Sequence, residues 1–202
     1  MEESNLTTPL VSVIIPAFNS GRFIMETVDS VLQQSYQALE IIVVDDNSTD
    51  GTAALLETKK ETTGRLHILK MQETQGAAAA RNSGFHNSKG RYIKFLDSDD
   101  LISSRMIEHQ VKLAVENEMS VVSGKWGRFY NNDLGTFRLN HEACWRDMDP
   151  VDWICSSWER AQAMTTPGIF LIPREIIGQA GLRDEQLSLY DDTEFFTRII
   201  LS

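Results

Sequence analysis

The chain has 202 residues, with 19 Lys and Arg against 29 Asp and Glu, and its formal net charge is -10 at pH 7. A chain of this length can bury a sizeable core. The acidic balance argues against a nucleic-acid partner, which requires a basic face, but it is compatible with a nucleotide whose phosphates are bridged to carboxylates by a metal ion.

The composition also bears on the cellular compartment. No stretch approaches the roughly 20 apolar residues that span a bilayer, and residues 1–8 are polar and acidic, unlike a secretory signal. The two cysteines, Cys144 and Cys155, form neither a disulfide framework nor a zinc pattern and are expected to be reduced thiols. A cytoplasmic protein is therefore expected, while peripheral attachment to the inner face of a membrane and the oligomeric state stay open.

Up to residue 100, apolar β-branched runs alternate with helical patterns. Strands are expected over residues 11–15, 40–44, 66–70 and 91–96. Helices are expected over 22–35, from about Thr49 with Asn47 or Ser48 as its cap, and from Gly76 to about Asn87. Near-continuous apolar strands separated by helices are typical of a parallel sheet covered on both faces. The sequence thus predicts an α/β fold with an open, mostly parallel twisted sheet.

The second half of the chain is less regular. Helices are expected over residues 103–117, 150–163 and from 191 onward, strands over 119–123, 125–130 and 168–172, and a loop over 131–150. Without a repeat or linker, residues 10–202 are expected to form one domain behind a disordered or extended tail at 1–9. Its nucleotide-binding half would run to about residue 100 and its acceptor half from about 101. Because residues 198–202 stop within an apolar helical pattern, the native chain is expected to continue.

Polar and acidic residues stand where the expected strands end. Pro16, Ala17 and Asn19 follow the first strand, Asp45 and Asp46 end the second, and Asp97, Ser98 and Asp99 follow the fourth. Ligands of open α/β sheets bind outside the carboxyl ends of the strands. Two carboxylates one residue apart can chelate a hard cation that also binds phosphate oxygens. The Asp97-Ser98-Asp99 segment therefore predicts a metal and nucleotide site.

Several of these residues have a second, structural interpretation. Asp45 and Asp46 could cap the following helix as readily as contact a ligand, and Asn19 could serve only as a turn residue. Arg81, on the alanine-rich helix that follows Gly76, requires an anionic partner if it is buried.

Three acidic residues, Asp191, Asp192 and Glu194, stand at the start of the last expected helix. They could complement the helix dipole. They could equally include a general base whose pKa is adjusted by neighbouring charge. The residues alone do not separate these alternatives.

In order along the chain, these motifs resemble family 2 glycosyltransferases with the GT-A fold. The resemblance covers nearly the whole chain from residue 10 and is carried by Val11 to Asn19, Ser30 to Tyr36, Glu40 to Thr52, Gly76 with Ala80 to Gly84, Gly90 to Asp100, Gly181 to Glu185, and Asp191-Asp192. It implies an inverting transfer of a sugar from a nucleoside-diphosphate donor, expected to be a UDP-sugar. The acceptor would be a hydroxyl of a saccharide or lipid-linked saccharide, in polysaccharide or glycoconjugate biosynthesis.

The resemblance also implies residue roles. The nucleotide would be surrounded by Pro16, Ala17, Asn19, Asp45, Asp46, Gly76, Arg81, Asp97 and Ser98. Asp97 and Asp99 would hold Mn²⁺ or Mg²⁺ on the diphosphate, and Asp192 would be the catalytic base. The family usually has Glu-Asp at the acceptor side, whereas this chain has Asp191 before Asp192. The shorter side chain leaves the base assigned to Asp192 by position, with Asp191 as the alternative.

Three other classes are compared with this one. A module that binds a nucleotide sugar without turnover shares the same motifs and stays open. A phosphoacceptor receiver domain also has a strand ending in Asp-Asp-Asn, but its acid pair follows the first strand, whereas here Asp45 and Asp46 follow the second. A dinucleotide oxidoreductase is excluded because no Gly-x-Gly-x-x-Gly follows the first strand.

Overall fold

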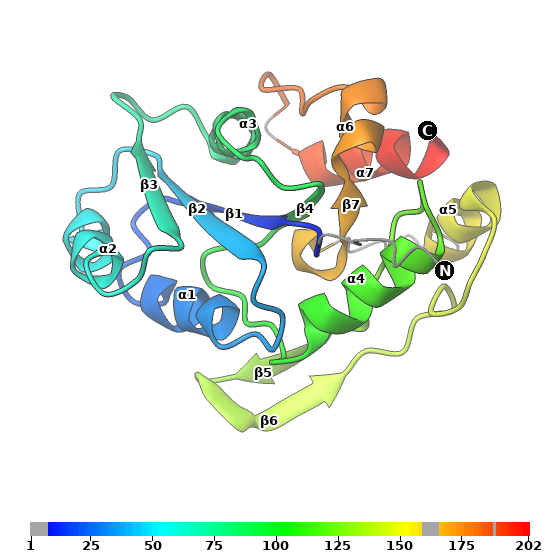
Figure 1. Cartoon of the computed structure of the whole chain (residues 1–202), viewed down its shortest axis with the longest axis horizontal. Helices are drawn as coiled ribbons and strands as arrows, with labels where there is room; N and C mark the ends of the chain where they lie inside the picture. The colour runs from blue at the N-terminus through cyan, green and yellow to red at the C-terminus, as the bar shows by residue number, and fades with distance from the viewer. Residues whose placement is uncertain (1–7, 159–165, 188) are drawn as a thin grey trace, which may run out of the picture.

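A five-stranded sheet in the order β3-β2-β1-β4-β7 forms the centre of the molecule (Figure 1). The computed structural model describes residues 8–158, 166–187 and 189–202. The strands β1 (Val11–Ala17), β2 (Leu39–Asp45), β3 (Leu66–Lys70) and β4 (Tyr92–Phe95) are parallel, and the short β7 (Ile172–Pro173) pairs antiparallel with β4. The four parallel strands therefore present their carboxyl ends at one edge of the sheet.

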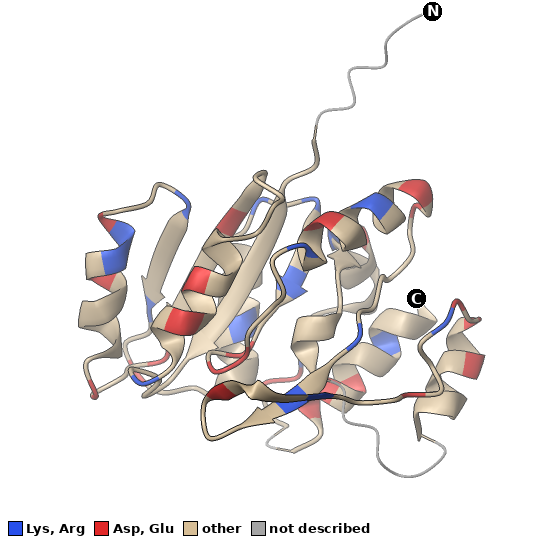
Figure 2. Ribbon diagram, turned by 90° about the horizontal axis from the view of Figure 1, so that it is seen from below, with Lys and Arg blue, Asp and Glu red and all other residues tan. Residues whose placement is uncertain are grey.

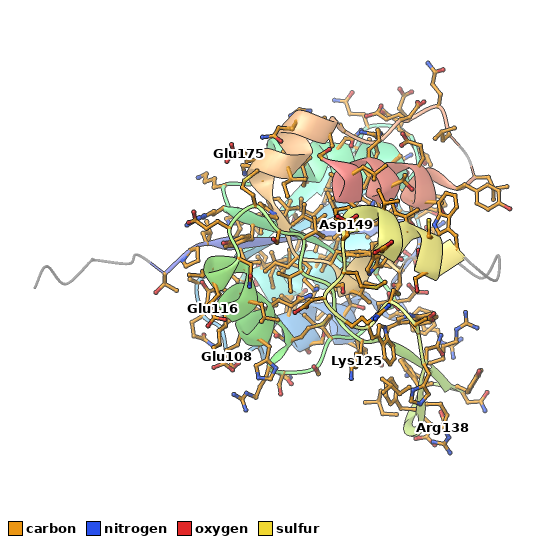
Figure 3. All side chains as sticks on the ribbon, turned by 90° about the vertical axis from the view of Figure 1, so that its right-hand side faces the viewer. Glu108, Glu116, Lys125, Arg138, Asp149 and Glu175 are labelled. Atoms are coloured by element: carbon orange, nitrogen blue, oxygen red, sulfur yellow. The ribbon has the colours of Figure 1, made fainter. Side chains whose placement is uncertain are left out.

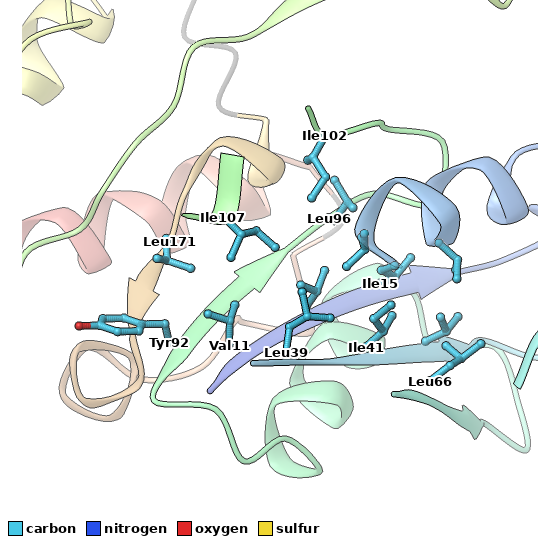
Figure 4. Packing of buried hydrophobic residues seen from close by; sticks show 14 of the residues in the cluster. Val11, Ile15, Leu39, Ile41, Leu66, Tyr92, Leu96, Ile102, Ile107 and Leu171 are labelled. Atoms are coloured by element: carbon cyan, nitrogen blue, oxygen red, sulfur yellow. The ribbon is translucent and has the colours of Figure 1, made fainter. Parts of the chain in front are cut away.

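Helices cover both faces of this sheet (Figure 1). The helices α1 (Ile24–Leu32), α2 (Thr52–Lys60) and α4 (Met106–Glu116) pack on one face, in a core that includes Val11, Val13 and Ile15 of β1 (Figure 4). On the other face lie α3 (Ala77–His86), α6 (Arg174–Ala180) and α7 (Asp191–Leu201), with Ile14 in the core below the last two. The predicted open α/β sheet covered on both faces is confirmed.

Pro16 lies inside β1 rather than after it. The carbonyl of Ile14 accepts the last bond from β4, donated by the Leu96 N–H, while the carbonyl of Ala17 accepts from Asp46 on the β2 side. Residues alternate in direction along a strand, so Pro16 faces the β4 side beyond the point where β4 has ended. Proline, which has no backbone N–H, can therefore occupy this position without the loss of a hydrogen bond between strands.

The prediction of a loop over residues 131–150 is wrong, because this range contains a strand. β5 (Gly127–Tyr130) and β6 (Asp133–Leu139) form a two-stranded antiparallel sheet beside the main one. Asn131 and Asn132, between the paired residues Tyr130 and Asp133, have φ of 57° and 55°. Two consecutive positive φ values match the twist of a tight hairpin, and asparagine tolerates them better than most residues. Figure 3 shows Lys125 and Arg138 on the hairpin side of the molecule.

Other boundaries also differ from the expectations. α2 begins at Thr52 behind Gly51, whose φ is 93°, so neither Asn47 nor Ser48 caps it. The expected strand at 119–123 is reduced to an isolated bridge between Val122 and Leu171. The expected strand at 168–172 begins instead with the 3-10 turn η1 (Pro167–Ile169), since the fixed φ of proline favours a helical first turn. α5 (Pro150–Trp158) starts as expected, and residues 159–163 of that prediction lie outside the described residues.

Charged residues of both signs lie on many of the described elements. Lysine and arginine residues are interspersed with acidic residues over several elements (Figure 2). None of the described helices is both long and apolar enough to cross a membrane. Cys144 is buried and Cys155 is exposed, and both are free thiols.

Candidate nucleotide and acceptor site

Loops from three parallel strands meet at the carboxyl edge of the sheet. Asn19, which follows β1, has a φ of 50° and joins this loop to the segment after β2. Its N–H donates to Ser48 Oγ and its Oδ1 accepts from the Thr49 N–H, both at 2.9 Å. Asp50 Oδ2 accepts from the Gly21 N–H at 2.9 Å in the same junction. Asn19 therefore has the structural turn role that its residue type allows.

Asp45 and Asp46 are buried, each 3% exposed, and their carboxylates bond within the chain. Asp45 Oδ1 accepts from the Ser48 N–H at 3.1 Å. Asp46 accepts from the N–H of Gln75 at 2.9 Å and of Gly76 at 2.8 Å. Gly76 has a φ of 95° and precedes α3, so Asp46 fixes the entry to α3. The interpretation that this acid pair caps α2, the next helix, is wrong.

A surface depression of about 570 Å³ borders this junction, lined by Met71, Gln72, Glu73 and Gln75. These residues follow β3 at the carboxyl edge, and Asp46 anchors the last of them. The volume lies within the range of roughly 300–1,000 Å³ that small-molecule sites occupy. Pro16 and Ala17 are buried at the end of β1 and are not among the residues that line the depression.

The Asp97-Ser98-Asp99 segment continues from β4 to the same edge. Asp97 Oδ1 lies 2.6 Å from an Arg81 Nη atom on α3, which confirms the expected anionic partner of that arginine. Ser98 Oγ lies 2.7 Å from Ser20 Oγ, and its carbonyl accepts from Thr27 Oγ1 at 2.9 Å. These contacts fix the segment against the loop after β1 and against α1.

Asp99 is exposed and has no hydrogen bond or ion pair with a described residue. Among the described residues, no three His, Cys, Asp or Glu side chains gather in a metal-binding cluster. Mg²⁺ bound with substrate phosphates typically takes one or two carboxylates from the protein. Asp99 and Asp97 therefore fit a cation that a diphosphate helps to hold, although Asp97 shares one oxygen with Arg81. Burial raises the pKa of the adjacent Asp100 to about 6.

The start of α7 reaches this edge through two buried arginines. Arg81 lies 3.6 Å from Asp191 Oδ2, and Arg183 lies 3.5 Å from the same oxygen. Arg183 also pairs with Asp192 Oδ1 at 2.5 Å. Burial raises the pKa of Asp192, while the Arg183 and Arg81 guanidiniums oppose that rise. The structure thus brings Asp97, Arg81, Asp191 and Asp192 together, and Glu194 turns away to pair with Arg198.

Two polar residues in this region were not assigned roles from the sequence. Asn82 bonds the main chain of Arg183 in both directions, at 3.1 and 3.0 Å. Arg183 itself belongs to a segment that carries the family resemblance, but no pattern in residue type or spacing marks it as a partner of Asp192. A contact between positions 101 residues apart leaves no periodic signal in the sequence.

Comparisons with known proteins place this geometry in a family. The family model described as glycosyl transferase family 2 matches residues 12–179. TuaG of Bacillus subtilis, whose name assigns it to teichuronic acid biosynthesis, is 44% identical over 108 residues, which are 54% of this chain and 43% of TuaG. WfgD of Escherichia coli, named as a UDP-Glc:alpha-D-GlcNAc-diphosphoundecaprenol beta-1,3-glucosyltransferase, is 34% identical over 125 residues, 62% of this chain and 49% of WfgD.

Solved structures share the fold. S. aureus TarS in complex with UDP-GlcNAc aligns with a TM-score of 0.79 at 21% identity, covering 95% of this chain and 53% of that one. The mannosyltransferase PcManGT from Pyrobaculum calidifontis, in complex with GDP-Man and Mn²⁺, aligns with a TM-score of 0.71 at 24% identity, covering 96% and 52%. At this identity the likeness establishes the GT-A type of fold.

The chain belongs to glycosyl transferase family 2, since the family model matches most of its length. Membership sets aside the receiver-domain alternative. The chain spans about half or less of the length of the curated relatives it matches.

Proposed function

We propose that this chain is the catalytic domain of an inverting glycosyltransferase that moves a sugar from a UDP-sugar to a hydroxyl of a saccharide or lipid-linked saccharide. One observation carries the proposal: Arg81 contacts Asp97 of the donor edge at 2.6 Å and Asp191 of the acceptor side at 3.6 Å. Two substrates held on either side of one side chain can react directly, and such positioning is a large part of catalysis.

Asp192 would act as the base. Its Oδ1 is held by Arg183, and no described residue bonds its other oxygen. That second oxygen would accept the proton of the acceptor hydroxyl while the hydroxyl attacks the anomeric carbon and the bond to the diphosphate breaks. Because burial raises the pKa of Asp192, the carboxylate is a stronger base than an exposed aspartate.

A divalent cation is part of the proposal. Mn²⁺ or Mg²⁺ held by Asp97 and Asp99 would stabilise the negative charge of the departing nucleoside diphosphate as a Lewis acid. Support comes from the exposed Asp99 carboxylate and from PcManGT, whose structure contains Mn²⁺. The name of WfgD supports a UDP-sugar and a lipid-linked acceptor, and hence work at a membrane surface in polysaccharide or glycoconjugate biosynthesis.

The donor site is tested by calorimetric titration of UDP with and without Mn²⁺. We expect binding that requires the metal and that is lost in Asp99→Ala. Asp29→Ala is the matched control, because Asp29 is an acid on α1 that pairs with Lys59 away from the carboxyl edge. Equal UDP affinity of the wild type and Asp99→Ala would contradict the metal assignment.

The base is tested with Asp192→Asn. This variant should bind UDP as the wild type does and lose transfer by about 10²–10⁴-fold, the usual contribution of general base catalysis. Transfer is measured as UDP release with a UDP-sugar and a panel of saccharide and lipid-linked acceptors. Undiminished transfer would exclude Asp192 as the base and favour Asp191. Binding of UDP-sugars without turnover in the wild type, with every acceptor, would favour the nucleotide-sugar-binding module instead.

A further inference from the structure

We propose that Arg183 is the positioning residue of the reaction, which orients Asp192 and keeps it ionised without touching either substrate. The inference rests on the proposed role of Asp192 as the base. It assigns a function to a buried arginine that neither nucleotide nor metal binding requires.

The contact between Arg183 and the acidic pair is direct. One Nη atom of Arg183 lies 2.5 Å from Asp192 Oδ1 and 3.5 Å from Asp191 Oδ2. The Arg183 side chain has no exposed surface, whereas those of Asp191 and Asp192 are 25% and 26% exposed. The arginine therefore lies behind the two carboxylates, and the carboxylates face the solvent from which an acceptor would arrive.

Arg183 is held by hydrogen bonds to its main chain and by aromatic rings around its guanidinium. Asn82 accepts from its N–H and donates to its carbonyl. The guanidinium lies over the rings of Phe195, Phe95 and Phe196, at 4.3, 5.1 and 5.4 Å from their centroids. A side chain fixed by both main-chain bonds and aromatic packing can define the position of a carboxylate bonded to it.

Burial of the charged Arg183 side chain costs stability, and the fold could be stabilised without this charge. Its Nε and second Nη atoms have no hydrogen-bond partner among the described residues, and the positive charge of Arg81 repels it. Apolar residues of similar volume commonly stabilise a fold as well as a buried ion pair does, or better. The aromatic rings around Arg183 would accept such a residue. The charge is therefore explained better by an effect on Asp191 and Asp192 than by stability.

The two acids have different surroundings. Asp191 Oδ2 is shared by Arg81 and Arg183, so its charge separates two cations that would otherwise repel each other. Asp192 has one close partner, Arg183, with one oxygen left unbonded by described residues. Asp191 therefore serves to neutralise the two arginines, and Asp192 is the carboxylate that reacts. Arg183 contacts both acids and keeps these two roles separate.

The charged groups acting on Asp192 are Arg183, Arg81 and Asp191. Both arginines lower its pKa, while burial and Asp191 raise it. Removal of the nearer arginine leaves burial and Asp191 less opposed, so the pKa of Asp192 should rise. A cation at this separation typically changes the pKa of a carboxyl by about 1–3 units.

The test compares Arg183→Met and Arg183→Lys in the full chain. In Arg183→Met, the acidic limb of the rate of transfer against pH should move upward by about 1–3 pH units. At pH 7, kcat should fall by about 10²-fold, the typical effect of a misplaced catalytic group, while UDP affinity is retained. Arg183→Lys keeps the charge and should restore the pH profile, and it also serves if the Met variant does not fold.

Arg174→Met is the matched control. Arg174 also lies over a phenylalanine, with its guanidinium 4.7 Å from the Phe85 ring centroid, and bonds Gly90 and Ser88 away from the acidic pair. Its pH profile should match the wild type. An unshifted acidic limb in folded Arg183→Met would overturn the proposal, as would equal losses of kcat in Arg183→Met and Arg174→Met.

Two further measurements separate this inference from the proposed function. In an Asp192→Asn background, Arg183→Met should cause no additional loss of transfer, whereas a purely structural role would reduce it again. Carboxyl ¹³C NMR titration of Asp192, with and without Arg183→Met, requires no activity. A shifted Asp192 titration in a protein without transferase activity would support the coupling and reject the base role, and an unshifted titration would overturn the coupling itself.

Discussion

Arg81 has two acidic partners that lie 94 positions apart in the chain, Asp97 and Asp191. Its side chain is 6% exposed, and its Nε atom bonds no residue in the described part of the chain. A guanidinium can reach two carboxylates with separate nitrogen atoms, which the single ammonium of lysine cannot do with the same geometry. Arginine is therefore the residue type that this position requires.

Replacement of Arg81 by Met should lower stability and weaken UDP binding together. Loss of the partner of Asp97 should cost about 1–3 kcal/mol, the usual cost of an unpaired polar group, since a third of the Asp97 side chain is exposed and water replaces part of the interaction. Urea unfolding and UDP titration measure the two effects. The control is Arg105→Met, which removes an exposed pair with Glu108 and should change stability by at most about 0.5 kcal/mol. Equal losses of stability in the two variants would contradict a stabilising role for the pair between Arg81 and Asp97.

At the scale of the element, α3 positions most of the candidate site. It starts at the glycine held by Asp46, presents Arg81 to the carboxyl edge and presents Asn82 to the acceptor side. It packs directly on β1 and β2 through Gly84. A Cβ atom at Gly84 would lie 2.3 Å from Ile14 Cγ2 and 3.3 Å from Val44 Cγ2.

Gly84→Ala should therefore destabilise the protein by about 1–3 kcal/mol through overpacking, although alanine is the better helix former. The matched control is Gly178→Ala in α6, where an added Cβ meets no atom within 4 Å. That variant should be neutral or more stable by about 0.5–1 kcal/mol. Thermal or urea unfolding of both variants measures this difference. A stabilising Gly84→Ala would show that α3 does not lie as close to the sheet as described.

At the scale of the whole molecule, a lysine side chain lies in the core between the sheet and the second half of the chain. Lys94 is in the middle of β4 and fully buried. Its Nζ donates to Gln110 Oε1 of α4 at 3.0 Å and to the Phe170 carbonyl at 3.4 Å. Gln110 also donates to the Ile169 carbonyl at 2.6 Å. This polar network joins β4, α4 and the segment that precedes β7.

Burial lowers the pKa of Lys94 to about 7 from its ordinary value of 10.5. Between these two values the unfolded chain binds a proton that the folded protein does not, so stability should rise with pH. Relative to Lys94→Met, the wild type should gain up to about 1.4 kcal/mol per pH unit above pH 7. Urea unfolding of both proteins at pH 7 and pH 9 measures this gain. Parallel pH dependences would mean that Lys94 keeps its proton in the folded state.

The sequence alone determined the four parallel strands of the sheet and the acidic residues at their ends. Four strands and three helices up to residue 96 follow from local periodicity, because a buried strand and an amphipathic helix each have their own spacing of apolar residues. The same pattern places Asp46, Asp97 and Asp99 just where strands end. Since parallel strands share a carboxyl edge, the place of these acids at one edge of the sheet was predictable before any contact was known.

The tertiary structure decided which of these groups meet. Asp46 bonds the entry to α3 and not α2, and Arg183, whose main chain is bonded by Asn82 from 101 positions away, pairs with Asp192. The hairpin at Asn131 and Asn132 likewise depended on backbone angles more than on apolar periodicity. Contacts of this kind depend on how separate segments are oriented by the packed core. Local residue preferences do not contain that orientation, because it is set by the simultaneous packing of all the elements.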